Sequence, residues 1–161
     1  MKRTLFAMLF LSLAIGLTDC QTNNTSTSKW EAIIGGSKKT GQYYTCFYEA
    51  SGDMGLIISL HESSSASIPY IQLTLEGNYP NDLTAGNYPL SSGVDEGSYI
   101  NTTQTFTTDN GGTGSLTLSK FNLSTKKISG TFSFTGKDSN GGSGSLTVTN
   151  GSFMDLDITV F

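Results

Sequence analysis

Strict alternation of apolar and polar residues through residues 127–138 constrains the fold more than any other feature of the chain. One face of this segment carries apolar side chains and the other carries hydroxyls: Ile128, Phe132 and Phe134 against Ser129, Thr131, Ser133 and Thr135. Because successive side chains of a β-strand point to opposite sides, a period of two predicts a strand with one buried face.

The same alternation recurs in three other segments, where it predicts which residues are buried. We expect the core to receive Leu56, Ile58 and Leu60, then Ile71, Leu73 and Leu75, and finally Met154, Leu156, Ile158 and Val160. The opposite faces of these strands should meet solvent. They carry His61 in the first strand and the carboxylates of Asp155 and Asp157 in the last.

Glycine-rich turns separate the predicted strands. "DNGG" at residues 109–112 and "DSNGG" at residues 138–142 supply residues that tolerate a positive φ, which tight hairpin turns require. Each turn is followed by a nearly identical strand start, "TGSLTL" and "SGSLTV", and residues 124–127 should turn the chain between them. Successive hairpins predict an antiparallel meander.

The composition favours an all-β fold. The 161 residues include 19 glycines, and 11% of the chain is aromatic, a mixture that suits strands and turns better than helices. We therefore predict an antiparallel β-sandwich or curled barrel of about eight or nine strands, following an N-terminal signal peptide. The net charge of −4 argues against a nucleic-acid partner, because phosphate binding needs clustered lysine and arginine.

Residues 77–97 form the longest irregular segment, and they contain Asn-Tyr-Pro twice. They are either a binding loop or a connection held by proline-fixed turns, with room for one short strand at 88–90. As a binding loop, this segment would offer Tyr79 and Tyr88 as candidate ligand-binding residues, because exposed aromatic rings can stack on sugars. We expect most other aromatic residues, including Trp30, to pack in the core.

The N-terminal residues 1–19 have the pattern of a secretory signal peptide. Lys2 and Arg3 precede an apolar run over residues 5–15, which is shorter than the about 20 residues of a transmembrane helix. An uncharged polar stretch, "QTNNTSTS", follows at residues 21–28 and is typical of a flexible tether.

Residues 17–20, "LTDC", resemble the bacterial lipobox, in which the cysteine is acylated and becomes the mature N-terminus. Leu17 and Cys20 match that pattern, whereas Asp19 stands where the lipobox prefers a small residue. The resemblance implies a signal peptide over 1–19 and a lipid on Cys20. A tether over 20–29 and a single β domain over 30–161 would follow.

A disulfide between Cys20 and Cys46 is the competing interpretation, since the cell envelope is oxidising. In "YYTCFY", however, alternation places Cys46 on one strand face with Tyr44 and Tyr48. That position predicts that Cys46 is a small, buried apolar side chain. A reactive thiol is not expected, because the segment contains no histidine or basic residue that would lower the thiol pKa.

Patterns for catalysis or metal binding are weak. His61 is the one histidine, and the chain lacks the G-x-S-x-G motif that presents a nucleophilic serine. The calcium-loop start at Asp138 is not completed, because position twelve is Thr149 instead of glutamate. The acidic pairs Asp95-Glu96 and Asp155/Asp157 could serve a glycosidase only across a cleft. We therefore expect neither an enzyme nor a cofactor or metal site.

Two stretches carry a further resemblance: "LTLSKFNLSTKKISGTFSFTGKD" and "GSLTVTNGSF", within residues 116–153. They resemble small β-rich lipoproteins of Bacteroidota-type bacteria, a family without an assigned activity. The resemblance implies an outer-membrane lipoprotein with a β-rich fold. The tether lacks the acidic residues that resemble a surface-export signal in some lipoproteins, so we expect the domain to face the periplasm. We expect a non-enzymatic accessory or binding role, with a glycan or an envelope protein as partner. The alternative is a carbohydrate-binding lipoprotein of a polysaccharide-uptake system.

Overall fold

The protein is all-β, as the alternation predicts. A computed structural model describes residues 28–49, 54–64, 67–76, 83–91 and 93–161, and no α-helix occurs among them. No helix in this part could therefore span a membrane. The strands are β1 (Trp30–Ile34), β2 (Ser37–Gly41), β3 (Tyr43–Tyr48), β4 (Met54–His61), β5 (Tyr70–Glu76), β6 (Gly86–Leu90), β7 (Asp95–Ile100), β8 (Thr105–Thr107), β9 (Thr113–Asn122), β10 (Lys127–Asp138), β11 (Ser145–Asp157) and β12 (Thr159–Val160).

The twelve described strands exceed the predicted eight or nine. The difference lies in short strands such as β2 and β8, of five and three residues, whose sequences lack a clear apolar alternation. Such strands are held by pairing with their neighbours, which a local pattern cannot reveal. Within residues 77–97, β6 contains the short strand that was allowed at 88–90, and the start of β7 is a second ordered part that the sequence did not predict.

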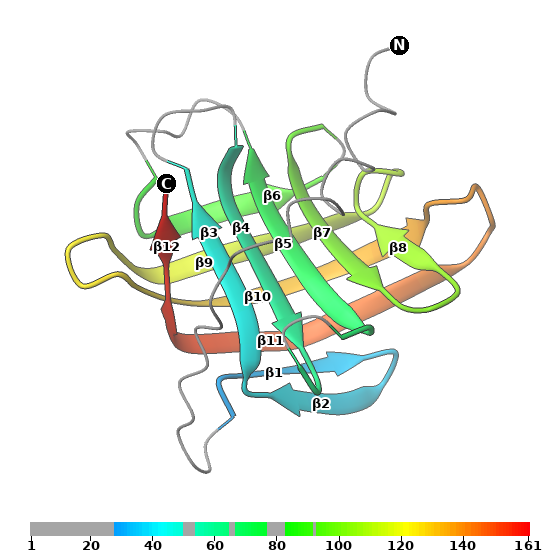
Figure 1. Cartoon of the computed structure of the whole chain (residues 1–161). Helices are drawn as coiled ribbons and strands as arrows, with labels where there is room; N and C mark the ends of the chain where they lie inside the picture. Colours follow the sequence, from blue (N-terminus) through cyan, green and yellow to red (C-terminus); the bar gives the residue numbers. More distant parts are fainter. Residues whose placement is uncertain (1–27, 50–53, 65–66, 77–82, 92) are drawn as a thin grey trace.

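All described strands belong to one open sheet. Its hydrogen-bonded order is β12-β3-β4-β5-β7-β8-β10-β11-β1-β2, with β9 paired to β10 and β6 paired to β9. The parallel pair of β12 with β3 differs from the other pairs, which are antiparallel. The sheet folds over itself, so that β3, β4, β5 and β7 form a front layer across β6, β9, β10 and β11 behind them (Figure 1). The short strand β8 joins the layers by pairing with both β7 and β10.

The core lies between the two layers. The ring of Tyr48 on β3 meets that of Phe121 on β9 edge to face, with centroids 5.2 Å apart. On β7, a Cβ added to Gly97 would lie 2.9 Å from the ring of Phe134 on β10. The inward residues predicted for three strands are confirmed as buried: Leu56, Ile58, Leu60, Ile71, Leu73, Leu75, Ile128, Phe132 and Phe134.

The last long strand departs from the prediction. Leu156 and Ile158 are buried as expected, but Met154 is 66% exposed and Val160 is 36% exposed. For Met154 the reason is a bulge: Ile128 and Gly130 of β10 pair with Leu156 and Phe153, so β11 has one extra residue between them. Val160 lies beyond β11, in the short strand β12. The bulge turns Met154 outward and puts Phe153 in the core.

The predicted turns are confirmed. Gly111 and Gly141 have φ values of 81° and 78° in the two glycine-rich turns, a conformation that glycine adopts without steric cost. Lys126, with φ of 51°, closes the turn between β9 and β10. Strands β9, β10 and β11 therefore form the expected antiparallel meander.

Candidate functional site

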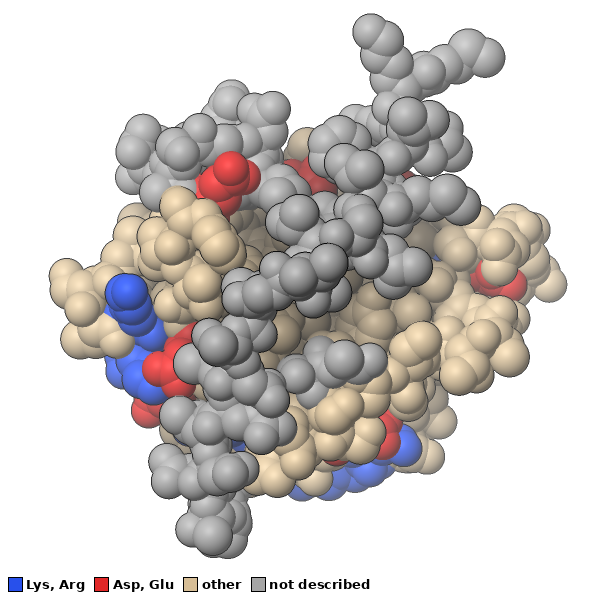
Figure 2. Space-filling model, in the orientation of Figure 1, with Lys and Arg blue, Asp and Glu red and all other residues tan. Residues whose placement is uncertain are grey.

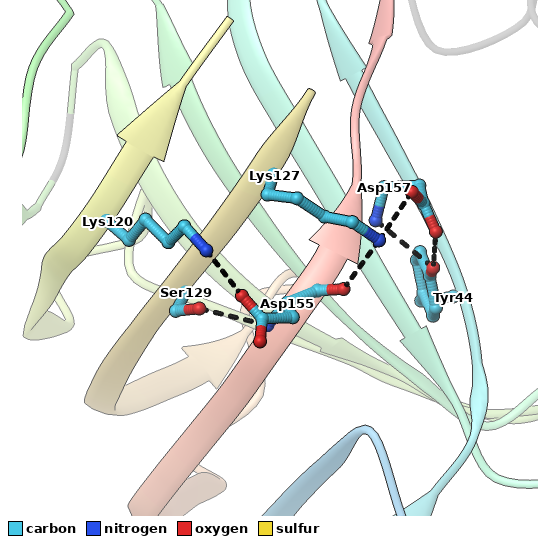
Figure 3. A network of polar contacts seen from close by, with 6 residues as sticks. All are labelled: Tyr44, Lys120, Lys127, Ser129, Asp155 and Asp157. Carbon is cyan, nitrogen blue, oxygen red and sulfur yellow. Dashed lines mark hydrogen bonds and ion pairs between the residues drawn. The ribbon is translucent and has the colours of Figure 1, made fainter. Parts of the chain in front are cut away.

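A cluster of charged residues surrounds the bulge in β11 (Figure 3). We call it the β11 cluster, and it consists of Tyr44, Lys120, Lys127, Ser129, Asp155 and Asp157. Lys120 pairs with Asp155 at 2.8 Å, and Lys127 pairs with Asp157 at 2.7 Å. Asp155 has a φ of 49°, and its backbone N–H donates to the Ser129 hydroxyl at 2.9 Å. A left-handed non-glycine residue is costly, so neighbouring contacts must hold it in place.

Tyr44 connects this cluster to the front layer. Its hydroxyl donates to Oδ2 of Asp157 at 3.0 Å and accepts from the Asp157 backbone N–H at 3.1 Å. Burial is the main cause that raises the pKa of the Tyr44 phenol, to about 12. Burial opposes ionisation of Asp157, but hydrogen bonds from Lys127 and Tyr44 outweigh it and lower the Asp157 pKa. At neutral pH, Tyr44 therefore stays a hydrogen-bond donor facing a carboxylate, and the contact ties β3 to the end of β11.

The alternation correctly predicts that Asp155 and Asp157 point outward, but it does not predict their partners. The missing signal is the strand register. Lys127 opens β10 directly opposite Asp157, and this pairing depends on the two places where β11 has one residue more than β10, as well as on the turn between the strands. Each carboxylate is thus paired with a lysine within one sheet face, an arrangement that neutralises charge and stabilises structure.

The outer face of the front layer carries three rows of residues that are aligned by strand register. We call this surface the outer face. Its rows are Tyr43, His61, Tyr70 and Ile100; Thr45, Ser59, Gln72, Ser98 and Thr107; and Phe47, Ile57, Thr74 and Glu96. A middle row of hydroxyls and one amide is thereby flanked by rows that contain aromatic rings.

Hydrogen bonds organise the polar part of the outer face. The Glu96 carboxylate accepts from the hydroxyls of Ser98 and Thr107, and Gln72 donates to Thr74 at 3.2 Å. Ser98, Thr107 and Thr74 are buried, whereas Tyr43, Phe47 and Tyr70 are half-buried. The aromatic rings thus keep part of their surface accessible beside fixed hydrogen-bonding groups.

His61 is buried at 5% exposure, so the prediction that it faces solvent is wrong. Its ring stacks on Tyr70 with centroids 4.9 Å apart, and its Nδ1 lies 2.8 Å from the Ser67 carbonyl oxygen. The residues that follow β4 thus approach the ring, which strand alternation cannot show. Burial lowers the His61 pKa, and the hydrogen bond to Ser67 offsets this only in part. The imidazole is therefore neutral at pH 7 and donates from Nδ1 to the carbonyl.

The predicted site residues do not come together. Tyr88 is buried at 9% exposure, and its hydroxyl donates to the Thr84 carbonyl at 2.7 Å, so the expectation that this ring is exposed is wrong. It occupies β6, whose pairing with β9 turns it toward the core. Tyr79 and Cys20 lie outside the described residues. Cys46 is free and 3% exposed, and burial raises its thiol pKa, so its predicted core position is confirmed.

Other candidate side chains also serve the fold. Trp30 is buried, and its indole N–H donates to the carbonyls of Tyr43 and His61 at 3.2 Å each. Asp138 binds within its own turn, where its carboxylate accepts from the Asn140 backbone N–H at 2.9 Å. Within the ranges that the structure describes, no group of three His, Cys, Asp or Glu residues could hold a metal ion.

Residues 63–157 match a family model described as "Domain of unknown function (DUF6252)", and this segment is more than half of the chain. The chain belongs to this family. No curated protein and no solved structure matches it significantly. The DUF6252 segment runs from just after β4 to the end of β11. It therefore includes the lysines and aspartates of the β11 cluster and leaves out Tyr44.

Proposed function

We propose that this DUF6252 protein is a lipoprotein of the cell envelope, anchored in the outer membrane through an acylated Cys20 and facing the periplasm. Its role is accessory or binding, without catalysis. The DUF6252 match names no activity. The proposal therefore rests on the resemblance of residues 17–20 to a lipobox, and on the resemblance of residues 116–153 to β-rich lipoproteins of Bacteroidota-type bacteria.

The observation that carries the proposal is the position of the first described strand. The polar residues after Cys20 lead to Lys29, whose backbone N–H donates to Gly41 at 2.7 Å, and β1 starts at Trp30. Nine residues thus separate the proposed lipid from the first strand, enough for a coil of roughly 15–18 Å. The signal peptide would occupy residues 1–19, the tether 20–29, and the domain 30–161.

The position of Cys46 supports acylation of Cys20 over the competing disulfide. Cys46 lies in β3 at 3% exposure, in the core cluster. A Cys20–Cys46 bond would require the segment before β1 to enter the core. The acid and base candidates of the described region also have structural partners: His61 stacks on Tyr70, and Asp155 and Asp157 pair with lysines.

The test is intact mass spectrometry of membrane and soluble fractions. Wild-type protein should begin at Cys20, carry a diacylglyceryl group and partition into detergent, and Cys20→Ala should abolish all three properties. Cys46→Ala is the matched control and should leave acylation unchanged. A soluble chain that has lost one pair of hydrogens, with both variants equally disruptive, would instead establish the disulfide.

A carbohydrate-binding role is the second candidate, and the outer face favours it. Half-buried Tyr43, Phe47 and Tyr70 lie in register beside the hydroxyl row and Glu96. Sugars are recognised by such combinations of flat rings and fixed polar groups.

For this candidate, Tyr70→Ala should weaken binding on a polysaccharide array about tenfold or more, because it removes a ring at the interface. Tyr88→Phe is the control and should bind as wild type does, since Tyr88 is buried in β6. Equal binding by wild type and Tyr70→Ala would remove the outer face as the glycan site.

A further inference from the structure

The tether joins the domain beside the β11 bulge. The Lys29 carbonyl oxygen accepts a hydrogen bond from the backbone N–H of Met154 at 3.0 Å. The side chain of Met154 is 66% exposed, because the bulge turns it out of the core. Lys29 also lies close enough to Asp155 and Asp157 to lower their pKa values, although it is not the main cause for either. The entry point of the tether is therefore next to an exposed apolar side chain and the β11 cluster.

The turn between β9 and β10 lies beside the end of β11, because the Lys126 carbonyl oxygen accepts a hydrogen bond from the Ile158 backbone N–H at 3.0 Å. Leu123 is 42% exposed, and Lys126 is exposed beside it in the turn. We call the combined region the tether-side surface, and it consists of Lys29, Lys120, Leu123, Lys126, Lys127 and Met154. It unites two exposed apolar side chains with four positive charges.

The charge of this surface contrasts with that of the whole protein. Seven lysines follow Cys20, and four of them belong to the tether-side surface, although the complete chain has a net charge of −4. Asp155 and Asp157 each pair with one lysine, Lys120 and Lys127. Lys29 and Lys126 then remain as a local excess of positive charge. On the side shown in Figure 2, lysines gather at the left and at the bottom, and acidic residues lie near both groups.

The length of the tether limits what this surface can meet. A coil of nine residues spans roughly 15–18 Å, and a domain of this size has a radius of gyration of about 14 Å. A lipid on Cys20 therefore keeps the domain within about its own radius of the bilayer. The part of the domain nearest to Lys29 is the part that reaches the headgroups most easily.

We propose that the tether-side surface docks on the anionic phospholipid bilayer that holds the Cys20 lipid, with Leu123 and Met154 entering the interface and the lysines facing lipid phosphates. This inference rests on the proposed anchor. Lysines near an anionic surface gain electrostatic attraction, and apolar side chains at the headgroup boundary gain burial.

The experiment uses the full chain, processed in a bacterial envelope, purified in detergent and reconstituted into vesicles. A nitroxide is attached to Leu123→Cys or, as a control, to Val94→Cys, which is 53% exposed in the wild type and lies between β6 and β7, away from the β9–β10 turn (Figure 1). Buried Cys46 and acylated Cys20 should not react with the label. Collisions with dissolved oxygen and with a water-soluble nickel complex then report whether each label lies in lipid or in water.

On vesicles of phosphatidylglycerol and phosphatidylcholine, the label at residue 123 should collide more with oxygen and several-fold less with nickel than the label at residue 94. On phosphatidylcholine alone this difference should shrink. The inference is overturned if the labels at residues 123 and 94 collide equally with nickel and with oxygen on protein whose intact mass shows the acyl chains. In that case the proposed lipid anchor is still supported. An unmodified Cys20 overturns both.

Lys126→Asn tests the charge contribution in the labelled protein. Asparagine accepts the left-handed backbone at this position, where φ is 51°, so the change removes charge without adding strain. The label at residue 123 should move toward water on anionic vesicles and stay unchanged on neutral ones. An identical depth with and without Lys126 would overturn the electrostatic part of the docking.

Discussion

Strands β4 and β11 belong to opposite layers of the sheet and differ in how regularly they pair with their neighbours. From Leu56 to His61, β4 pairs residue for residue with both of its neighbours, and its apolar side chains alternate into the core. β11 is interrupted twice along its pairing with β10, and the interruptions coincide with Asn150 and Asp155. These two residues have left-handed φ values of 51° and 49°.

The comparison shows how a long strand can bend around a core. Each bulge gives β11 one residue more than β10 over the same length, which increases the local twist. In the first bulge the inward positions move from Val148 to Gly151, and in the second from Phe153 to Leu156. The second bulge also exposes Met154 and positions Asp155 for Lys120. The irregular strand thus contributes the charged cluster in addition to the core residues Val148, Phe153 and Leu156.

The largest expected effect tests which side chains of β10 point into the core. Strand β11 pairs with β10, so its own inward residues depend on the answer. Phe132 is buried and its ring lies over Gly151, where a Cβ would collide with it. Phe132→Ala should lower the free energy of unfolding by about 3–5 kcal/mol, because it leaves a cavity between the layers. Thr131→Ala, one residue away and exposed, should change it by less than about 0.5 kcal/mol. Urea denaturation measures both, and equal costs would contradict this facing.

A smaller effect should distinguish the bulged strand from the regular one. Asn150→Val should cost about 1–2 kcal/mol, because a β-branched residue is strained at a left-handed φ, whereas Asn150→Gly should be tolerated. In β4 the order should reverse, with Ile57→Val milder than Ile57→Gly. The denaturant midpoints of the four variants measure these changes in stability. Valine tolerated equally at residues 57 and 150 would contradict the bulge.

An effect of similar size at neutral pH concerns the contact between the two layers at Tyr44. Tyr44→Phe should cost about 1–2 kcal/mol at pH 7, because it removes the hydroxyl that bridges to Asp157.

The same variant should differ more clearly at alkaline pH. The folded pKa of Tyr44 is raised to about 12 from the ordinary 10, so the unfolded chain loses this proton first. The stability that Tyr44 provides is complete below pH 10 and is lost as the pH rises through 12. Stability curves from pH 8 to 12 should therefore fall more steeply for wild type than for Tyr44→Phe. Parallel curves would argue against the buried phenol.

The regular strands could be predicted from the sequence because their burial follows a local period. Leu56, Ile58 and Leu60 alternate without interruption, and so do the inward residues of β5. The turns were also predictable, since Gly111 and Gly141 are needed where φ is positive. The bulges were not predicted, because alternation alone extends a strand without interruption, although asparagine and aspartate tolerate the left-handed backbone of Asn150 and Asp155.

The candidate sites were harder to predict because they depend on distant partners. The β11 cluster joins Tyr44 to Asp157, which are 113 positions apart. His61 is shielded by contacts with Tyr70 and Ser67, residues beyond the end of its strand. The sequence allowed a short strand at residues 88–90, but only the pairing of Tyr88 with Leu116 on β9 shows that this ring turns toward the core.

The pairing of β1 with β11 sets the order in which the domain can form. Trp30, at the start of the domain, pairs with Phe153, and β12 pairs with β3. Such contacts between distant parts of a chain close large loops and form slowly. Until residues 145–160 are available, β1 and β3 lack these partners and their edges can pair with other chains. A chain exported with its N-terminus first, as we propose, must therefore remain unfolded and guarded against aggregation until nearly all of it has crossed the membrane.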